Sequence, residues 1–175
     1  MRILFFAAAL TASSAALGEV KSSGPGGFRI EAKQVVSATP AETWAMLGRI
    51  GEWWSKDHTY SGNAANLSLE LRAGGCFCER LPAEKGKSLG GVAHGRVLTA
   101  MPGSMLVLDA PLGPLQSEAA VGRLTWSLRA VAGGTEVTQS FVAGGYFDGK
   151  AEKLAPLVDQ VLSQQLHGLK RRLAR

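Results

Sequence analysis

The sequence predicts an α+β fold made of one strand, two short helices, six further strands and a long C-terminal helix. Three observations predict it. Apolar and polar residues alternate in short runs, glycines and prolines lie between these runs, and apolar residues recur at helical spacing near the C-terminus. The chain has 175 residues, of which 46% are hydrophobic and 19% charged, so it suffices for one domain with a substantial core.

The first 18 residues have the pattern of a signal peptide. Arg2 precedes the apolar run 3–10, and Ala16-Leu17-Gly18 supplies a small-x-small cleavage site. The apolar run is too short to span a bilayer, which takes about 20 residues. The alternative is an N-terminal helix that packs on the domain. We expect cleavage near Gly18 and export to the periplasm or the medium.

The mature chain is expected to begin with a flexible lead-in over residues 19–27, followed by one domain over residues 28–175. Residues 28–36 alternate as a half-buried strand. Thr39-Pro40-Ala41-Glu42 then has the N-cap, first-turn proline and capping-box glutamate of a helix start. A second short helix is expected over residues 50–55.

Six more strands are expected, at residues 67–71, 76–81, 92–99, 105–109, 123–131 and 135–142. The last element is a helix that ends near Arg172. Its apolar positions have helical spacing: Leu154, Val158, Val161, Leu162, Leu166, Leu169 and Leu173. Pro156 marks either the first turn of this helix or a kink within it.

The formal net charge is +5, and four cations lie at the extreme C-terminus: Lys170, Arg171, Arg172 and Arg175. We interpret them as complementing the negative end of the helix dipole. Nucleic-acid binding would call for basic residues interleaved with aromatic ones, or for a recognisable module, and the sequence has neither. We expect no nucleic-acid partner, and at most a weak contact with anionic membrane surfaces.

Several motifs, in this order, resemble the START-like superfamily (SRPBCC, birch-pollen-allergen-like), and above all its polyketide-cyclase and heat-shock-ATPase-activator branch. The similar segments are Thr39–Trp44, Trp53-Trp54, Gly74-Gly75-Cys76-Phe77, and His94–Leu98 followed by Met101-Pro102. The resemblance covers residues 28–175. It implies a helix-grip fold, in which a curved seven-stranded antiparallel sheet wraps around the C-terminal helix and leaves a cavity between them. It implies no single reaction, because one fold hosts many functions.

Strand alternation places Phe77 and Glu79 on the concave face of such a sheet. A carboxylate that faces an apolar cavity needs a partner, and burial should raise its pKa. Glu79 is therefore the candidate polar anchor or catalytic acid/base. The alternative is that it lies at the cavity rim and stays solvated.

The other candidate ligand-binding residues are chosen by the same parity or by their place in the resemblance: Trp53, Trp54, Trp126, Gln139, Phe141 and Val158. Trp53 and Trp54 are expected to close one end of the cavity. Aromatic residues at such positions also serve as plain core, and that alternative stays open. Gln139 lies between apolar neighbours on its strand and therefore needs a hydrogen-bond partner.

Cys76 and Cys78 leave three alternatives. Same-face neighbours on a strand lie about 6.6–7 Å apart, at the edge of disulfide reach, so a bond between them requires a bulge. If the following hairpin places Cys78 opposite His94, the two cysteines and His94 cluster, and His58 would complete a zinc-like set. The spacing matches no standard zinc pattern, and a one-residue slip separates the cluster. We favour unpaired structural cysteines and no metal.

These features favour an exported binding or carrier protein for a small hydrophobic, lipid-like or aromatic ligand. The alternative is a cofactor-independent cyclase, dehydratase or isomerase that uses Glu79. A third candidate, a heat-shock-ATPase activator, conflicts with export because that partner is cytosolic. The sequence has no phosphate loop or dinucleotide motif, so we expect no cofactor.

Overall fold

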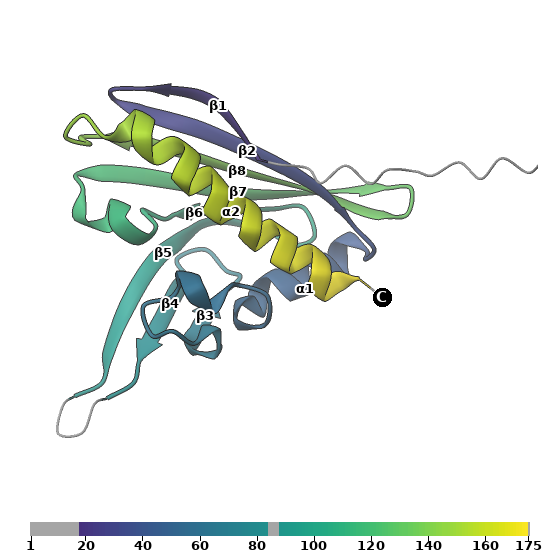
Figure 1. The fold of residues 1–175 in the computed structure, drawn as a ribbon. Helices are drawn as coiled ribbons and strands as arrows, with labels where there is room; N and C mark the ends of the chain where they lie inside the picture. Colours follow the sequence, from purple (N-terminus) through teal and green to yellow (C-terminus); the bar gives the residue numbers. More distant parts are fainter. Residues whose placement is uncertain (1–17, 84–87, 175) are drawn as a thin grey trace, which may run out of the picture.

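The structure is a computed structural model that describes residues 18–83 and 88–174. A curved antiparallel sheet of eight strands, in the order β1-β2-β8-β7-β6-β5-β4-β3, forms the body of the protein. One long helix, α2 (Ala151–Leu173), lies across the concave face of this sheet (Figure 1). The predicted arrangement of a curved sheet around a C-terminal helix is therefore confirmed.

The strands agree closely with the alternating runs of the sequence. They are β1 (Glu19–Gly24), β2 (Gly27–Val36), β3 (Leu67–Leu69), β4 (Cys76–Leu81), β5 (Gly90–Met101), β6 (Met105–Asp109), β7 (Ala120–Val131) and β8 (Gly134–Gly145). The tight hairpin predicted at Gly133-Gly134 joins β7 to β8, with Gly133 at φ 83°, a backbone conformation that glycine adopts readily.

The eighth strand is β1, in the segment that we expected to be a flexible lead-in. Its residues pair with β2 from Glu19↔Glu31 to Gly24↔Gly27, with a register shift between Val20 and Ser22. The segment is rich in serine and glycine and alternates weakly, so its sequence gave no strand signal. Pairing with the edge of β2 supplies the hydrogen bonds that hold it. The predicted cleavage site lies mostly outside the described residues.

The first helix, α1 (Pro40–Gly48), begins as predicted. The Thr39 hydroxyl accepts a hydrogen bond from the Glu42 amide at 3.2 Å, and the Glu42 carboxylate accepts one from the Thr39 amide at 2.9 Å. This reciprocal pair is the capping box. Short 3-10 helices follow at Ile50–Glu52, Lys56–His58 and Ala64–Asn66, and a fourth lies at Gly113–Ser117.

The helix α2 includes Pro156 in its interior, where proline removes one helical hydrogen bond. Towards its C-terminus, α2 lies directly against the backbone of Trp53, the residue that follows the first 3-10 helix. Gly168 makes this possible, because a Cβ atom there would lie 2.3 Å from the carbonyl oxygen of Trp53. Leu162, Leu166 and Leu169 are almost fully buried in the core.

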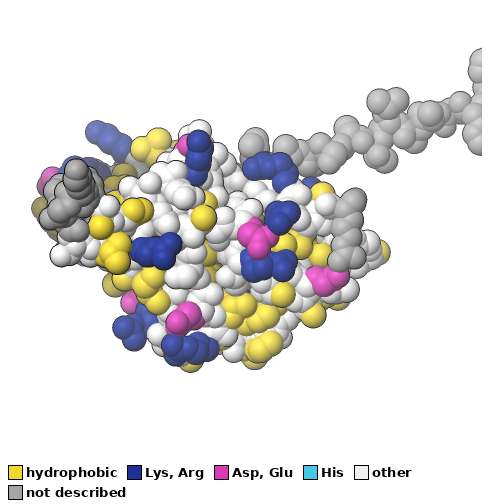
Figure 2. Space-filling model, turned by 90° about the horizontal axis from the view of Figure 1, so that it is seen from below, with side chains coloured by type: hydrophobic (Ala, Val, Ile, Leu, Met, Phe, Trp, Pro, Cys, Tyr) yellow, Lys and Arg dark blue, Asp and Glu magenta, His cyan; other side chains and the backbone are white. Residues whose placement is uncertain are grey.

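Three of the four C-terminal cations, Lys170, Arg171 and Arg172, lie in the last turn of α2, as predicted, and Arg175 lies outside the described residues. Lys170 Nζ donates to Gln34 Oε1 at 2.9 Å, and Arg172 forms an ion pair with Glu52 at 2.6 Å. On the face shown in Figure 2, Lys and Arg side chains are spread among acidic and hydrophobic ones. Across residues 18–83 and 88–174, no helix is long and apolar enough to cross a membrane.

Candidate ligand-binding cavity

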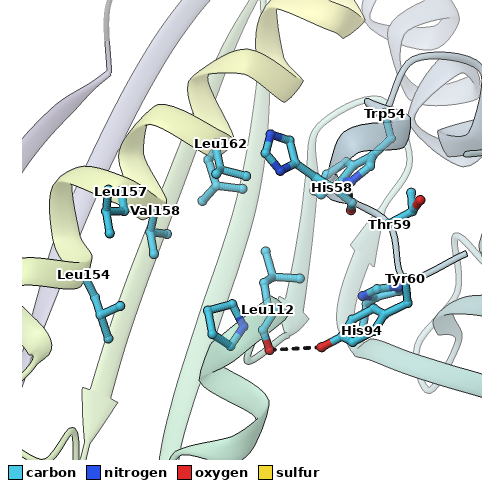
Figure 3. A pocket seen from close by; sticks show the side chains of 13 residues that line it. Trp54, His58, Thr59, Tyr60, His94, Leu112, Leu154, Leu157, Val158 and Leu162 are labelled. Atoms are coloured by element: carbon cyan, nitrogen blue, oxygen red, sulfur yellow. Dashed lines mark hydrogen bonds between the residues drawn. The ribbon is translucent and has the colours of Figure 1, made fainter. Parts of the chain in front are cut away.

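An open cavity lies between the N-terminal half of α2 and the facing part of the molecule (Figure 3). Its volume is about 500 Å³. One wall consists of apolar side chains from successive turns of α2: Leu154, Leu157, Val158, Val161 and Leu162. The apolar residues that recur at helical spacing in the sequence thus extend beyond the packed core, and in this part of α2 they face the cavity.

The opposite wall is built from two segments that are distant in the sequence. One part consists of Trp54, of His58 at the end of the second 3-10 helix, and of Thr59 and Tyr60, which follow it. Leu112, Gly113 and Pro114 form the other. The Tyr60 hydroxyl donates a hydrogen bond to the Gly113 carbonyl at 3.3 Å and so connects the two segments.

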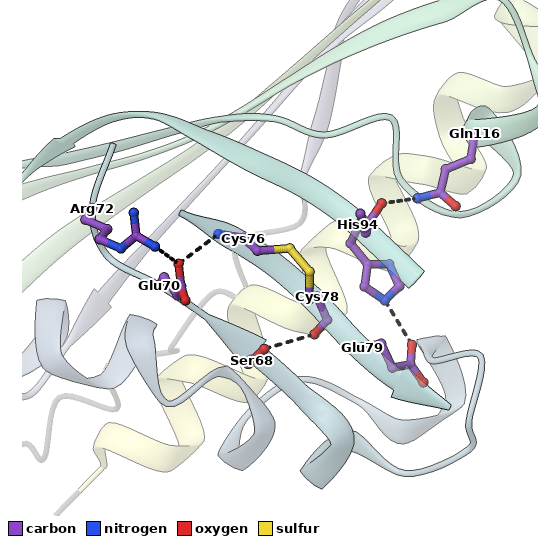
Figure 4. The surroundings of a disulfide bond; sticks show 9 residues. Ser68, Glu70, Arg72, Cys76, Cys78, Glu79, His94 and Gln116 are labelled. Atoms are coloured by element: carbon purple, nitrogen blue, oxygen red, sulfur yellow. Dashed lines mark hydrogen bonds and ion pairs between the residues drawn. A yellow bond between two sulfur atoms is a disulfide. The ribbon is translucent and has the colours of Figure 1, made fainter. Parts of the chain in front are cut away.

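Two histidines line the cavity, and their surroundings differ. His58 lies at the surface, where its Nε2 is 2.8 Å from Gln164 Oε1 on α2. His94, on β5, is buried, and its Nε2 is 2.9 Å from Glu79 Oε2 (Figure 4). The side chains of His94 and Glu79 are 6% and 0% exposed. His94 is therefore a polar group held inside an otherwise apolar wall.

Glu79 faces inward, as strand parity predicted, yet it does not line the cavity. Its carboxylate accepts the backbone N–H of Tyr60 at 3.0 Å and that of Ser61 at 2.5 Å, in addition to His94. Glu79 thus fixes the loop that carries Tyr60 and orients the imidazole that reaches the cavity.

The expected rise in the pKa of Glu79 was wrong. Burial does favour the protonated form, and it is the largest single effect on this carboxyl group. Hydrogen bonds from Ser61, from the Tyr60 amide and from His94 act in the opposite direction and together lower the pKa below its usual value. Glu79 thus accepts hydrogen bonds from all three partners in its charged form.

Of the other predicted ligand-binding residues, Trp54 and Val158 line the cavity. The rest lie in the core: Trp53, Phe77, Trp126, Gln139 and Phe141. Gln139 has the partners that its burial requires, because its Oε1 accepts from Trp126 Nε1 and its Nε2 donates to the Leu162 carbonyl, each at 2.8 Å. This pair of bonds ties α2 to β7 and β8 and leaves no room for a ligand there.

Cys76 and Cys78 form a disulfide, contrary to the unpaired thiols that we favoured. Their Cα atoms are 5.4 Å apart, within reach of a disulfide. The register shifts between Phe77 and Cys78, so that Cys78 pairs with Ala93 and His94 becomes the extra residue on β5. The bulge lies on β5, opposite the strand that carries the two cysteines.

The same bulge separates the zinc-like set of His58, Cys76, Cys78 and His94. The two sulfurs bond to each other, while His94 points into the domain and contacts Glu79. Among the described residues, no group of three or more His, Cys, Asp or Glu side chains is arranged to hold a metal ion.

The helix residues Leu154, Val161 and Leu162 face the cavity, as expected, whereas the wall formed by Leu112, Gly113 and Pro114 was not predicted, and neither were Tyr60 and Leu157. The apolar spacing of α2 was visible, but it did not tell which turns face a filled core. His94 was considered only as a metal ligand. Strand alternation could not place it, because the bulge on β5 changes the parity at this residue.

No protein-family model and no curated protein matches this sequence. Solved structures do. A protein from Rhodobacter sphaeroides has a TM-score of 0.58 at 18% identity, over 89% of this chain and 97% of that one. CalU16 from Micromonospora echinospora has a TM-score of 0.55 at 17% identity, over 82% of this chain and 73% of that one.

A third solved structure is the di-domain ARO/CYC StfQ from the steffimycin biosynthetic pathway. It has a TM-score of 0.55 at 13% identity, over 83% of this chain and 50% of that one. At such identities the likeness concerns the fold. The chain has a helix-grip fold. The resemblance to the START-like superfamily is thereby supported at the level of the fold.

Proposed function

We propose that the protein binds a small hydrophobic molecule in the cavity between α2 and the sheet. The observation that carries this proposal is the cavity itself, about 500 Å³ with mostly apolar walls. Ligand-binding pockets commonly have volumes of about 300–1,000 Å³ and apolar linings with a few polar groups that orient the ligand. His94, His58 and Tyr60 are such polar groups here.

The exposure of the helix wall supports the same proposal. Leu157 is 58% exposed at the cavity, whereas Leu166, about two and a half turns further along α2 and outside the cavity lining, is 1% exposed. A bound apolar molecule would remove Leu157 and its neighbours from water, at about 25 cal/mol per Å² of apolar surface. A lipid-like or aromatic skeleton fits this lining.

We also propose that the protein is exported. Residues 1–18 have the signal-peptide pattern described above, and the Cys76–Cys78 disulfide fits an oxidising compartment. The expected mature N-terminus is at or near Glu19, which N-terminal sequencing of the exported protein would test. A weak contact with anionic membranes and the absence of a nucleic-acid partner remain predictions.

The binding proposal is tested with N-phenyl-1-naphthylamine, an uncharged apolar dye whose fluorescence rises in apolar surroundings. Wild-type protein is expected to bind it, and Val158→Phe is expected to weaken binding by about tenfold or more, because the larger ring fills the cavity. Gln160→Phe, on an exposed position of the same helix, is the control and should bind like wild type. Equal binding by all three proteins would contradict the proposal.

An enzyme of the cyclase, dehydratase or isomerase type is the second candidate function. The observation in its favour is the Glu79–His94 pair, because a carboxylate that orients a histidine is a common arrangement for moving protons. The likeness in fold to StfQ is compatible with it. Since Glu79 does not line the cavity, it would act through His94.

Native mass spectrometry of the purified protein distinguishes the two candidates. A molecule that the protein retains would be isolated, returned to fresh protein and followed by mass and by chromatography. A carrier leaves the molecule unchanged. A dehydratase removes one water, and a cyclase or isomerase changes the retention time at constant mass.

A further inference from the structure

The polar end of the cavity is a single imidazole whose hydrogen-bonding pattern is fixed. Glu79 is an ionised carboxylate that accepts from Tyr60, Ser61 and His94, so it has no hydrogen to donate. The hydrogen between the two side chains therefore belongs to His94 Nε2. In the neutral imidazole, the other nitrogen, Nδ1, then carries a lone pair and accepts hydrogen bonds.

Two aromatic rings hold the imidazole in place. The Phe77 ring centre is 4.8 Å from that of His94, and the Tyr60 ring centre is 5.8 Å away. Together with the bond to Glu79, they restrict rotation of the ring. The bulge at His94 turns this side chain to the concave side of β5, where it becomes part of the cavity lining.

His94 Nδ1 has no hydrogen-bond partner among the described residues. It is not fully buried either, because the only enclosed side-chain nitrogen or oxygen without a partner in residues 18–83 and 88–174 is Thr43 Oγ1. Since His94 lines the cavity, the accessible surface of Nδ1 lies there. An acceptor inside an apolar wall is thus available to a ligand.

We infer that the ligand carries a weakly acidic hydroxyl group, a phenol or an enol, and that this group binds His94 Nδ1. The inference rests on the proposed binding function. The apolar walls accommodate the carbon skeleton, and the O–H donates to the Nδ1 lone pair. If the proton crosses, the O–H bond breaks, its electron pair stays on oxygen, an Nδ1–H bond forms, and Glu79 stabilises the imidazolium.

His58 does not provide an equivalent site. Its Nε2 donates to Gln164 at the surface, and no carboxylate holds it. A ligand ether or ester has no O–H that could donate to His94. The protein should therefore bind a hydroxyl compound more tightly than its methyl ether. This difference separates the inference from the plain binding proposal, which requires only apolar contact.

The test compares 2-naphthol with 2-methoxynaphthalene by calorimetry, using the full mature chain. We expect wild type to bind 2-naphthol about 3–10-fold more tightly, the value of one hydrogen bond of ordinary strength. His94→Gln should abolish the preference while retaining affinity for the ether. Its amide can still donate to Glu79, and it has no acceptor at the Nδ1 position. His167→Gln, on α2 outside the cavity, is the control.

A second measurement does not depend on a variant. An excited naphthol transfers its proton to a base in direct contact, so fully bound 2-naphthol should emit in the naphtholate band. Equal affinities for the two probes, or emission from neutral naphthol alone, would overturn the inference and leave the binding proposal intact. Loss of the preference in His58→Gln instead of His94→Gln would also overturn it. If neither probe binds, the binding proposal itself fails, and the inference fails with it.

Discussion

The two halves of α2 meet the concave sheet in different ways. Along the C-terminal half, Leu162, Leu166 and Leu169 are buried against the core, and Gly168 lets the helix touch the backbone of Trp53. Along the N-terminal half, Leu154, Leu157 and Val158 are partly or largely exposed at the cavity. We name these two regions the filled half and the open half.

The difference shows that apolar spacing alone does not determine burial. In the filled half, Trp126 is fully buried beneath the helix, where its ring packs against Trp53, the residue that Gly168 approaches. Two hydrogen bonds, from Trp126 to Gln139 and from Gln139 to the carbonyl of Leu162, hold the helix at the boundary between the two halves. In the open half, the facing elements are loops and His94, and these leave space. Stability and ligand binding therefore depend on different turns of one helix.

The largest expected effect comes from one substitution made in each half. Leu166→Ala should lower the free energy of unfolding by about 2–5 kcal/mol, because it leaves a cavity in packed core. Leu157→Ala should change it by no more than about 0.5 kcal/mol, because this side chain is already exposed. Urea denaturation measures both values. Similar losses for the two variants would remove the distinction between the halves.

An intermediate effect is expected at the wall of the open half. Glu79→Gln should lower the free energy of unfolding by about 1.5–3 kcal/mol at neutral pH, because charge-assisted hydrogen bonds are lost. The pKa of Glu79 is lowered by folding, so its contribution is complete above the unfolded value near 4.5 and is lost as the pH falls below it. Between pH 7 and about pH 3, the free energy of unfolding should therefore fall more for wild type than for Glu79→Gln, which urea denaturation at each pH measures.

The control for this pH series is Glu152→Gln, which changes an exposed glutamate in the first turn of α2. It should follow the wild-type pH dependence closely. If the unfolding free energy of Glu79→Gln fell with decreasing pH as much as that of wild type, the carboxylate would not be stabilised by its partners.

The smallest effect is expected from the disulfide next to the open half. Replacement of Cys76 and Cys78 by serine should cost about 1–2 kcal/mol, because a bond that closes such a short loop restricts the unfolded chain only slightly. Urea denaturation with and without a reductant measures this, and the double variant should not respond to the reductant. A loss as large as that of Leu166→Ala would mean that the bond also holds the bulge at His94.

Much of the fold could be predicted because its signals are local. Thr39 and Glu42 form the expected capping box, and parity placed Phe77 and Glu79 on the inner face. The strand β1 could not be predicted, because pairing with β2 rather than its own alternation holds it. The extra residue at His94 left no mark in the sequence either.

The cavity was predicted only in part. That a helix and a curved sheet would leave a cavity followed from the resemblance, but its position depends on which side chains fill the space. Trp126 and Phe141 share the parity expected of ligand-facing residues, yet both are fully buried in the core. The residues that line the cavity come from loops such as 58–60 and 112–114, whose course no periodic pattern describes.

The edges of the sheet have a consequence for how copies of this protein meet. An open sheet of eight strands exposes two edges, and a regular exposed edge is a template for strand addition and aggregation. Here one edge is β3, only three residues long, and the other is β1, which is interrupted by a bulge and carries Lys21. Short, irregular and charged edges discourage growth by backbone pairing. The sheet is thus protected at both ends, although it never closes into a barrel.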